Sequence, residues 1–517
     1  MSRPIDTILI IDCGSQFTQL IARRVREQHV YSIIRPPTLP YDDFTAIAPK
    51  GVIISGSHFS VHDTHAPQIP AFVMEAGVPI LGICYGQQWL CQHFGGVIKQ
   101  STAREFGRAQ ITVTKSSPLF QGVWSCHDKA DVWMSHGDTI LTLPSPIKSL
   151  AQSDAIPNAI FAWDERKIYG VQFHPEVVHT PQGSALLRQF VRGIAQCAPT
   201  WTEEHIVDAL THRIKEQVGH EKVLCALSGG VDSAVTAALL HRAIGNNLTC
   251  LFIDNGLLRE GEGENIMALA QAHIPCETIQ LNKQQTFLSK LKGVTDPEEK
   301  RRVIGHTFIE CFTEATASLK TPIPFLAQGT LYPDVIESTQ TAHAKPIKSH
   351  HNVGGLPDHM AMTLVEPLRS LFKDEVRLIG KTLGLPDAFL KRHPFPGPGL
   401  AVRIPGAITK KKLDILRHAD RLYRDELKKA GLYDAIWQAF AVLLPVRSVG
   451  VMGDKRSYDY ALSLRAITSQ DGMTASVYPF DIDVLGTIAT RIVNNVEGVN
   501  RVLYDITSKP PATIEWE

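Results

Sequence analysis

The sequence predicts a multidomain α/β protein with two parallel-sheet α/β domains, followed by a smaller C-terminal α+β domain. Two observations predict this class. Short apolar runs alternate with helical patterns through roughly the first 195 residues, and the same alternation begins again near Lys222. A stretch rich in Pro and Gly then follows Arg392. We therefore expect domains at residues 1–197, 198–392 and 393–517, because 517 residues are too many for a single core.

The first domain is expected to contain a parallel sheet. Residues 8–11, 51–54 and 79–82 form short apolar runs, as is typical of strands that are buried on both faces. Each run is followed by Gly or polar residues and then by a helical pattern. The composition of residues 196–200 indicates a linker, and helical spacing follows over residues 201–218.

The second domain is expected to begin with the strand-like run 222–227. Residues 231–243 are rich in Ala and Leu and predict a helix, and residues 249–254 predict the next strand. In such a βαβ arrangement, ligands bind at the carboxyl ends of the strands. The Pro/Gly run at 392–399 cannot form a regular helix or a central strand. Beyond it, a long helical stretch at 410–430 and several strand-like runs predict the α+β domain.

Composition excludes several classes of function. Lys and Arg together number 52, as do Asp and Glu, so there is no electrostatic case for a nucleic-acid or membrane partner. No apolar run approaches the roughly 20 residues that span a bilayer, and the first residues lack the pattern of a secretory signal. Nine cysteines without a C-x-x-C pair favour free thiols in a reducing compartment. We therefore expect a cytoplasmic protein.

A Gly-x-Cys-x-Gly turn at residues 82–86 predicts a reactive thiol. A nucleophile on a tight strand-to-helix turn needs small neighbours, and a glycine on each side of Cys84 supplies them. Residues 169–176 predict a strand that ends in His-Pro-Glu, and alternate residues of an extended segment face the same way. His174 can therefore reach the thiol while Glu176 orients the imidazole. The alternative is a buried structural cysteine with a structural histidine.

The string Ser-Gly-Gly-Val-Asp-Ser at residues 228–233 predicts a phosphate-binding loop. Its glycines allow the backbone to approach a phosphate, and N–H groups at a helix start surround the anion together with the Ser228 and Ser233 hydroxyls. Asp232 can hold Mg²⁺ that bridges phosphates. The string is not a Walker A motif, because no Gly-Lys-Ser/Thr follows. The alternative is a glycine-rich turn without a ligand, and Asp254 is either an adenosine contact or a turn former.

The two sites resemble two known families. The cysteine turn and the His-Pro-Glu segment resemble the class I glutamine amidotransferases, and the phosphate-binding loop resembles the PP-loop of the ATP pyrophosphatases. The resemblance implies that Cys84 attacks the side-chain amide of L-glutamine and that His174 is the general acid/base. It also implies an oxyanion hole formed by the N–H groups of Gly56 and Tyr85. Many relatives have Ser-Gly-Gly-Pro where residues 55–58 of this chain are Ser-Gly-Ser-His.

Longer strings resemble the family of glutamine-hydrolysing GMP synthases over essentially the whole chain. They lie at residues 326–338, 347–357, 392–403 and 508–517. The resemblance implies amination of XMP at C2, with ammonia from L-glutamine, through an adenyl-XMP intermediate formed with Mg-ATP. It also implies a homodimer that is formed by the C-terminal domain. The residues implied are Ser228, Gly229, Gly230, Val231, Asp232, Ser233, Ala234 and Asp254 for ATP, with Asp232 as the Mg²⁺ ligand, then Asp334, Glu337 and Lys348 for a lid over the ATP site, and Arg301, Lys509 and Glu515 for XMP.

Other functions are open at this point. Another glutamine-dependent PP-loop ligase, such as an NAD synthetase, would have a nitrilase-type Glu-Lys-Cys set in place of His174 and Glu176. A tRNA-modifying PP-loop enzyme would show a basic face and often paired cysteines. A regulatory protein with a degenerate amidotransferase domain would have lost Cys84 or its partners. Because the chain has all three residues and no paired cysteines, the amidating ligase is favoured.

Overall fold

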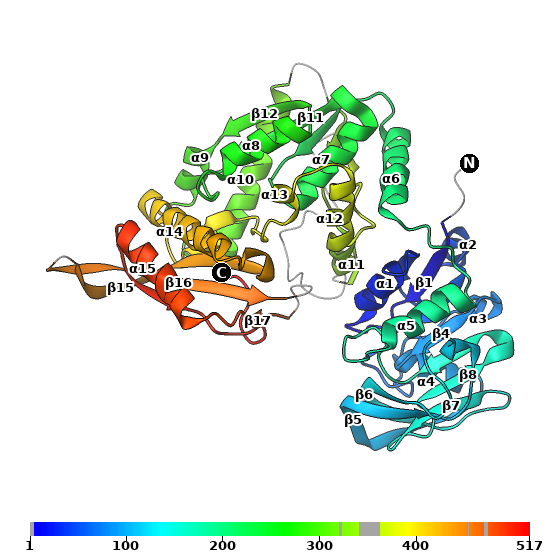
Figure 1. Ribbon diagram of the computed structural model, residues 1–517. Helices are drawn as coiled ribbons and strands as arrows, with labels where there is room; N and C mark the ends of the chain where they lie inside the picture. The colour runs from blue at the N-terminus through cyan, green and yellow to red at the C-terminus, as the bar shows by residue number, and fades with distance from the viewer. Residues whose placement is uncertain (1–4, 320–322, 341–361, 453, 470–473) are drawn as a thin grey trace. The chain divides into compact units, whose positions relative to one another are not determined.

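The computed structural model describes residues 5–319, 323–340, 362–452, 454–469 and 474–517. The chain divides into two compact units, Met1–His205 (unit 1) and Ile206–Glu517 (unit 2), and many of their elements are labelled in Figure 1. Within the described residues, no helix combines the length and the apolar character that crossing a membrane requires.

Unit 1 is built on a nine-stranded sheet in the order β2-β1-β3-β4-β9-β8-β7-β5-β6. The first five strands pair in parallel, and the remaining pairs are antiparallel. The elements are β1 (Thr7–Ile11), α1 (Thr18–Arg26), β2 (Tyr31–Arg35), α2 (Tyr41–Ile47), β3 (Gly51–Ile54), α3 (Ala71–Glu75), β4 (Ile80–Ile83), α4 (Tyr85–His93), β5 (Val97–Val113), β6 (Lys129–Thr142), β7 (Lys148–Ser153), β8 (Ile160–Trp163), β9 (Ile168–Val171) and α5 (Gly183–Arg188).

The predicted parallel sheet of the first domain is confirmed, since the three apolar runs are β1, β3 and β4. Every residue of these strands is buried, which explains why their sequences are apolar throughout. The antiparallel extension was not predicted. In β6 buried residues alternate with partly exposed ones, so this strand lacks the continuous apolar run on which the prediction depends.

Unit 2 begins with a five-stranded parallel sheet in the order β12-β11-β10-β13-β14. The predicted strand and helix near the phosphate-binding loop are confirmed as β10 and α7, and the next predicted strand is β11. The elements are α6 (Glu203–Val218), β10 (Val223–Ala226), α7 (Val231–Ile244), β11 (Leu248–Asp254), α8 (Glu262–His273), β12 (Glu277–Asn282), α9 (Gln284–Lys290), α10 (Pro297–Ala317), β13 (Phe325–Ala327), α11 (Tyr332–Gln340), β14 (Thr363–Val365), α12 (Lys373–Thr382) and α13 (Asp387–Leu390).

The C-terminal part of unit 2 is α+β, as expected. A second sheet has the order β15-β16-β17, with β18 parallel to β16, and the predicted long helix is α14. One hydrophobic cluster joins residues of β10, α10, α14 and β15, among them Leu224, Ile304, Leu416 and Ala441. This core is continuous across the domain boundary predicted between residues 392 and 393, so that boundary stays a prediction. The elements are α14 (Lys410–Lys429), β15 (Gln438–Met452), β16 (Lys455–Thr468), β17 (Ser476–Val477), α15 (Ile482–Asn495) and β18 (Val499–Tyr504).

Candidate active sites

Cys84 lies at a strained turn between β4 and α4. Its backbone has a left-handed φ of 53° and a ψ of −106°, a conformation that costs free energy for any residue with a side chain. The flanking glycines make the turn possible. A Cβ at Gly82 would lie 2.5 Å from the carbonyl carbon of Gly86, and a Cβ at Gly86 would overlap the carbonyl oxygen of Ile54. The local sequence therefore forms the nucleophile elbow that its spacing predicts.

His174 and Glu176 lie beyond the end of β9, in irregular backbone. The strand predicted over residues 169–176 ends at Val171, so the alternation of side chains along a strand does not apply to His174 and Glu176. The backbone N–H of His174 instead donates to the carbonyl oxygen of Trp133 on β6. The predicted pairing of the two side chains is nevertheless present. His174 Nδ1 lies 2.6 Å from Glu176 Oε1, and both residues are buried.

The pKa of His174 is raised well above its ordinary value. Burial opposes protonation of the imidazole, but the negative charge of Glu176, a hydrogen bond with the Cys84 sulfur and a hydrogen bond with Glu176 together outweigh it. The raised pKa makes the imidazole a stronger base toward the thiol proton and favours the imidazolium that pairs with a thiolate.

Gly56 lies beside this pair of residues. A Cβ at Gly56 would lie 3.3 Å from Cε1 of His174 and 3.6 Å from Cβ of Cys84. Gly56 is followed by Ser57 and His58, where many relatives have Gly and Pro. Ser57 Oγ accepts a hydrogen bond from the N–H of Phe59 at 3.2 Å, which holds the loop together. Tyr85 is the first residue of α4, where N–H groups have no partner within the helix. Unit 1 thus brings together all five residues predicted for the thiol site.

The phosphate-binding loop joins β10 to α7, and hydrogen bonds within the loop hold its shape. Gly229 has a φ of +77°, and a Cβ there would overlap the side chain of Ile266. The hydroxyls of Ser228 and Ser233 lie 3.0 Å apart, and Ser233 Oγ accepts the N–H of Ser228 at 3.2 Å. The N–H of Gly230 donates to Ser228 Oγ at 3.3 Å. The loop is therefore preformed at the start of α7, as anion binding at a helix N-terminus requires.

Asp232 lies in the first turn of α7. Its Oδ2 is 3.3 Å from Nζ of Lys373. Its Oδ1 is buried, and no residue that the structure describes makes a hydrogen bond to it. A buried carboxylate oxygen without a partner is rare in folded proteins. The oxygen therefore fits a divalent cation such as Mg²⁺, which prefers carboxylate and phosphate oxygens.

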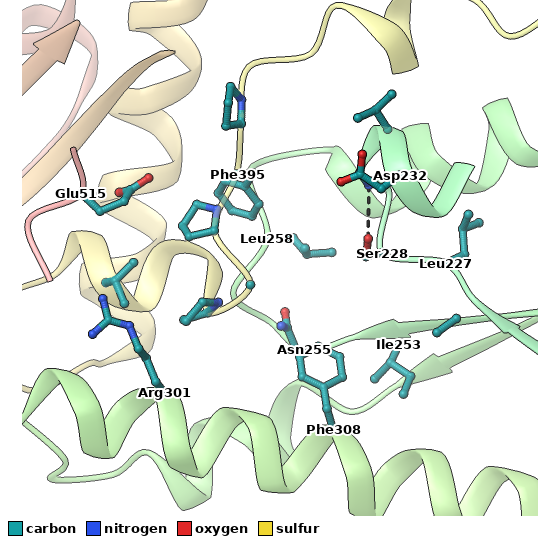
Figure 2. A pocket seen from close by; sticks show the side chains of 18 of the residues that line it. Leu227, Ser228, Asp232, Ile253, Asn255, Leu258, Arg301, Phe308, Phe395 and Glu515 are labelled. Carbon is teal, nitrogen blue, oxygen red and sulfur yellow. Dashed lines mark hydrogen bonds between the residues drawn. The ribbon is translucent and has the colours of Figure 1, made fainter. Parts of the chain in front are cut away.

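A cavity of about 1440 Å³ opens from this loop toward the C-terminal part of unit 2. Figure 2 shows Ser228 and Asp232 at one side of it and Arg301 and Glu515 at the other, with Phe395 between them. Predicted site residues that line it are Ser228, Gly230, Val231, Asp232, Arg301, Lys509 and Glu515. The structure thus brings four of the residues predicted for ATP and the three predicted for XMP into one cavity, although the two sets lie far apart in sequence.

The XMP candidates also contact other protein groups. Arg403 donates to both carboxylate oxygens of Glu515, at 3.0 and 2.8 Å, and Gln438 Nε2 donates to one of them at 2.7 Å. Arg301 pairs with Glu298 on the same helix at 2.5 Å. A nucleotide that uses these side chains must therefore share them with their present partners.

Other predicted residues lie outside the lining of the cavity. The carboxylate of Asp254 accepts the N–H of Gly256 at 2.9 Å and Nε2 of Gln284 at 2.8 Å, which is the turn-forming arrangement that the sequence left open. Gly229, Ser233 and Ala234 are not among the lining residues. Asp334 accepts the N–H of Leu331 at 3.1 Å. Lys348 and the side chain of Glu337 lie outside the described residues.

Sequence reasoning gave no site role to several lining residues, among them Lys373, Arg392 and Phe395. Arg392 Nη1 donates to the carbonyl oxygen of Gly229 at 2.5 Å, so it connects the phosphate-binding loop with the Pro/Gly run. From the sequence, that run is interpreted as a domain boundary and as part of a string that carries the family resemblance, without a role in a cavity. A stiff Pro/Gly segment that directly follows an arginine is a signal that could have identified residues 392–399 as the wall of a cavity. Lys373 had no such signal, because nothing near it in sequence forms a motif.

Comparisons with known proteins agree with this division into sites. The family described as "Glutamine amidotransferase class-I" matches residues 9–194, "NAD synthase" matches 202–302, and "GMP synthase C terminal domain" matches 425–516. A relative from Rhodopseudomonas palustris is 57% identical over 99% of this chain and 95% of its own length. Relatives from Mesorhizobium japonicum and Brucella suis are 56% and 55% identical, over 99% of each chain. All three relatives are named GMP synthase (glutamine-hydrolyzing).

Proposed function

The chain belongs to the family of glutamine-hydrolysing GMP synthases, and from this premise we propose how its residues make GMP. The reaction consumes ATP, XMP, L-glutamine and water, and yields GMP, AMP, diphosphate and L-glutamate. The observation that carries this function is the match over nearly the full length of relatives that share the name. An NAD synthetase-like activity is not favoured, because that family matches only residues 202–302.

In unit 1, Cys84 is the nucleophile that attacks the side-chain amide of glutamine. His174 takes the thiol proton and delivers it to the leaving ammonia, while Glu176 holds the imidazole by the 2.6 Å hydrogen bond. The N–H groups of Gly56 and Tyr85 stabilise the tetrahedral oxyanion. Water then hydrolyses the thioester with His174 as general base, which releases glutamate. The preformed elbow supports these roles, since Cys84 and His174 already interact through a hydrogen bond.

In unit 2, the C2 oxygen of XMP attacks the α-phosphate of ATP and diphosphate leaves. The N–H groups and hydroxyls of the phosphate-binding loop hold the departing diphosphate. Asp232 would hold a Mg²⁺ ion, which when bound supplies positive charge to the phosphates. Ammonia attacks C2 of the adenylated XMP, and AMP leaves. The cavity of about 1440 Å³ exceeds the roughly 300–1,000 Å³ of a typical small-molecule pocket, which supports simultaneous binding of both nucleotides.

Arg301 and Lys509 are proposed to bind the XMP phosphate, because guanidinium and ammonium groups recognise phosphate well. Glu515, oriented by Arg403, is proposed to accept hydrogen bonds from the purine. Asp334, Glu337 and Lys348 are proposed for the lid on the resemblance alone. A homodimer is also proposed, and it is supported by exposed apolar side chains on β15 and β16, among them Val449, Val451 and Tyr458.

We place the protein in a reducing compartment such as the cytoplasm. All nine cysteines are free thiols, and the reaction requires that Cys84 stays reduced. This placement agrees with the expectation from cysteine spacing.

The experiment that tests the function follows XMP consumption with Mg-ATP and either L-glutamine or ammonium. We expect GMP, AMP and diphosphate in equal amounts with both nitrogen sources, and one glutamate for each GMP with glutamine. If neither nitrogen source consumes XMP, the acceptor is wrong. If only ammonium supports the reaction, the role of unit 1 is wrong.

Glu176→Gln is expected to shift the alkaline limb of glutamine-dependent activity to lower pH. The thiolate–imidazolium pair exists only below the pKa of His174, and the charge of Glu176 is the largest of the effects that raise this pKa. Without that charge, burial lowers the pKa and the pair is lost at a lower pH. The measurement is kcat/KM for glutamine between about pH 6 and pH 10. Ammonium-dependent synthesis is the control, and an unchanged alkaline limb would contradict the prediction.

A further inference from the structure

A buried amide, that of Gln172, lies against the reactive sulfur. Gln172 follows β9 and is 1% exposed. Its Nε2 lies 3.7 Å from Sγ of Cys84. Besides His174, whose imidazole also makes a hydrogen bond with this sulfur, the carbonyl oxygen of Ser135 on β6 lies 3.5 Å from it. The sulfur therefore has a hydrogen-bond donor at one position and an acceptor at another.

The orientation of this amide is fixed by a second glutamine. Gln88 on α4 directs its Nε2 at Oε1 of Gln172, 3.1 Å away, and at the carbonyl oxygen of Asp138, 3.0 Å away. Because the nitrogen of Gln88 can only donate, the oxygen of Gln172 must face it. The NH₂ group of Gln172 is then the part that faces Cys84. If the oxygen and nitrogen of Gln172 were exchanged, its NH₂ group would face the NH₂ group of Gln88, and two donors would meet without an acceptor.

We propose that Gln172 stabilises the ionised sulfur of Cys84 by a hydrogen bond from Nε2, and that Gln88 is the positioning residue that orients this amide. The inference rests on the proposed function of Cys84 as nucleophile. In the neutral state the S–H group donates to the Ser135 carbonyl. When the proton moves from Sγ to His174, that carbonyl oxygen faces a negative sulfur and repels it. Nε2 of Gln172 is then a second donor to the sulfur beside the imidazolium of His174, and hydrogen bonds to an ionised group are roughly twice as strong as neutral ones.

The titratable groups around the Cys84 sulfur do not replace the hydrogen bond from Gln172. His174 and Glu176 lie beyond β9, and His136 on β6 interacts with His174 and Glu105. Asp138 on β6 accepts a hydrogen bond from Ser60 at 2.5 Å. None of these groups occupies the position of the amide between Gln88 and the sulfur. A neutral donor at that position favours the thiolate without adding a charge to the site.

The test measures how fast iodoacetamide alkylates Cys84 as a function of pH. The full chain is used, the Cys84 peptide is quantified by mass spectrometry, and the exposed Cys126 is the internal reference. Gln172→Glu keeps the size of the side chain and places a carboxylate beside the sulfur. We expect the midpoint of the alkylation profile to rise by about one pH unit or more, and kcat/KM for glutamine to fall by about 10- to 100-fold.

The matched control is Gln87→Leu against Gln172→Leu. Gln87 is also a buried glutamine of α4, but its Nε2 donates to the carbonyl oxygens of Asn158, Ala159 and Gly170. We expect Gln172→Leu to raise the midpoint, and Gln87→Leu to keep the wild-type midpoint even where it lowers thermal stability. If Gln172→Leu does not fold, the isosteric Gln172→Glu decides.

Two outcomes overturn the proposal. The first is a wild-type alkylation midpoint in Gln172→Glu. The second is an equal shift in Gln87→Leu and Gln172→Leu, which would assign the effect to packing. A different result would contradict the proposed role of Cys84 as nucleophile. In that case, wild-type protein whose Cys84 is completely alkylated would keep its full glutamine-dependent activity.

Discussion

Cys84→Ala is expected to abolish glutamine-dependent GMP synthesis and to retain ammonium-dependent synthesis. Loss of the nucleophile of a catalytic triad lowers the rate by about 10⁴-fold or more, and the alanine side chain offers no replacement for the sulfur. Ammonium bypasses unit 1, because it reaches the adenylated XMP of unit 2 from solution. The measurement is GMP formation with saturating XMP and Mg-ATP, with glutamine and with ammonium in parallel.

Cys91→Ala is the matched control for this prediction. Cys91 is a buried cysteine of α4, and its sulfur lies 3.7 Å from the carbonyl oxygen of Thr142. Both activities should persist in this variant. Glutamine-dependent synthesis that survives in Cys84→Ala would show that another nucleophile releases the ammonia.

Asp232→Asn is expected to lower synthesis with both nitrogen sources by about 10²- to 10³-fold, the loss typical of removing one electrostatic contact to a transition state. The substitution keeps the shape of the side chain and removes its charge. It thereby weakens the site that the buried, unpartnered Oδ1 offers to a divalent cation. The measurement is diphosphate release with ammonium as the nitrogen source, over a range of Mg²⁺ concentrations.

The control for Asp232→Asn is Asp208→Asn. Asp208 is an exposed residue of α6 that pairs with Arg242 at 3.0 Å, and surface pairs of this kind contribute about 0–1 kcal/mol to stability. We expect its activity to equal that of the wild type. An unchanged rate of diphosphate release in Asp232→Asn would exclude this carboxylate from the ATP site.

The parts of the fold that depend on short stretches of sequence were predictable. The elbow at Cys84 needs only the two glycines, and the phosphate-binding loop needs only the residues between β10 and α7. The hairpin of β5 and β6 was not predicted, although it supplies the Ser135 contact to the sulfur, because its alternation of buried and exposed residues resembles no continuous buried run. Local patterns therefore located both reactive centres but not all of their surroundings.

The large cavity of unit 2 could be predicted only in part. Arg301 and Glu515 carry no local pattern that places them near Asp232, and only the resemblance to a family linked them to one substrate. The Arg403–Glu515 pair connects residues that are more than 100 positions apart. Such contacts follow from the packing of α10, α14 and β15 into one core, which no short window of sequence contains.

The two sites need different lengths of the chain, and this difference sets the order in which the ribosome completes them. The five residues of the thiol site all lie within unit 1, whereas the cavity of unit 2 needs residues from Ala226 to Glu517. Ribosomes add about 5–20 residues each second, so the remainder of the chain takes on the order of 15–60 s to emerge. On the proposed function, a nascent chain thus contains all five residues of the glutamine site before any acceptor for its ammonia exists. An enzyme made in this order conserves glutamine only if unit 1 stays nearly inactive until unit 2 has folded.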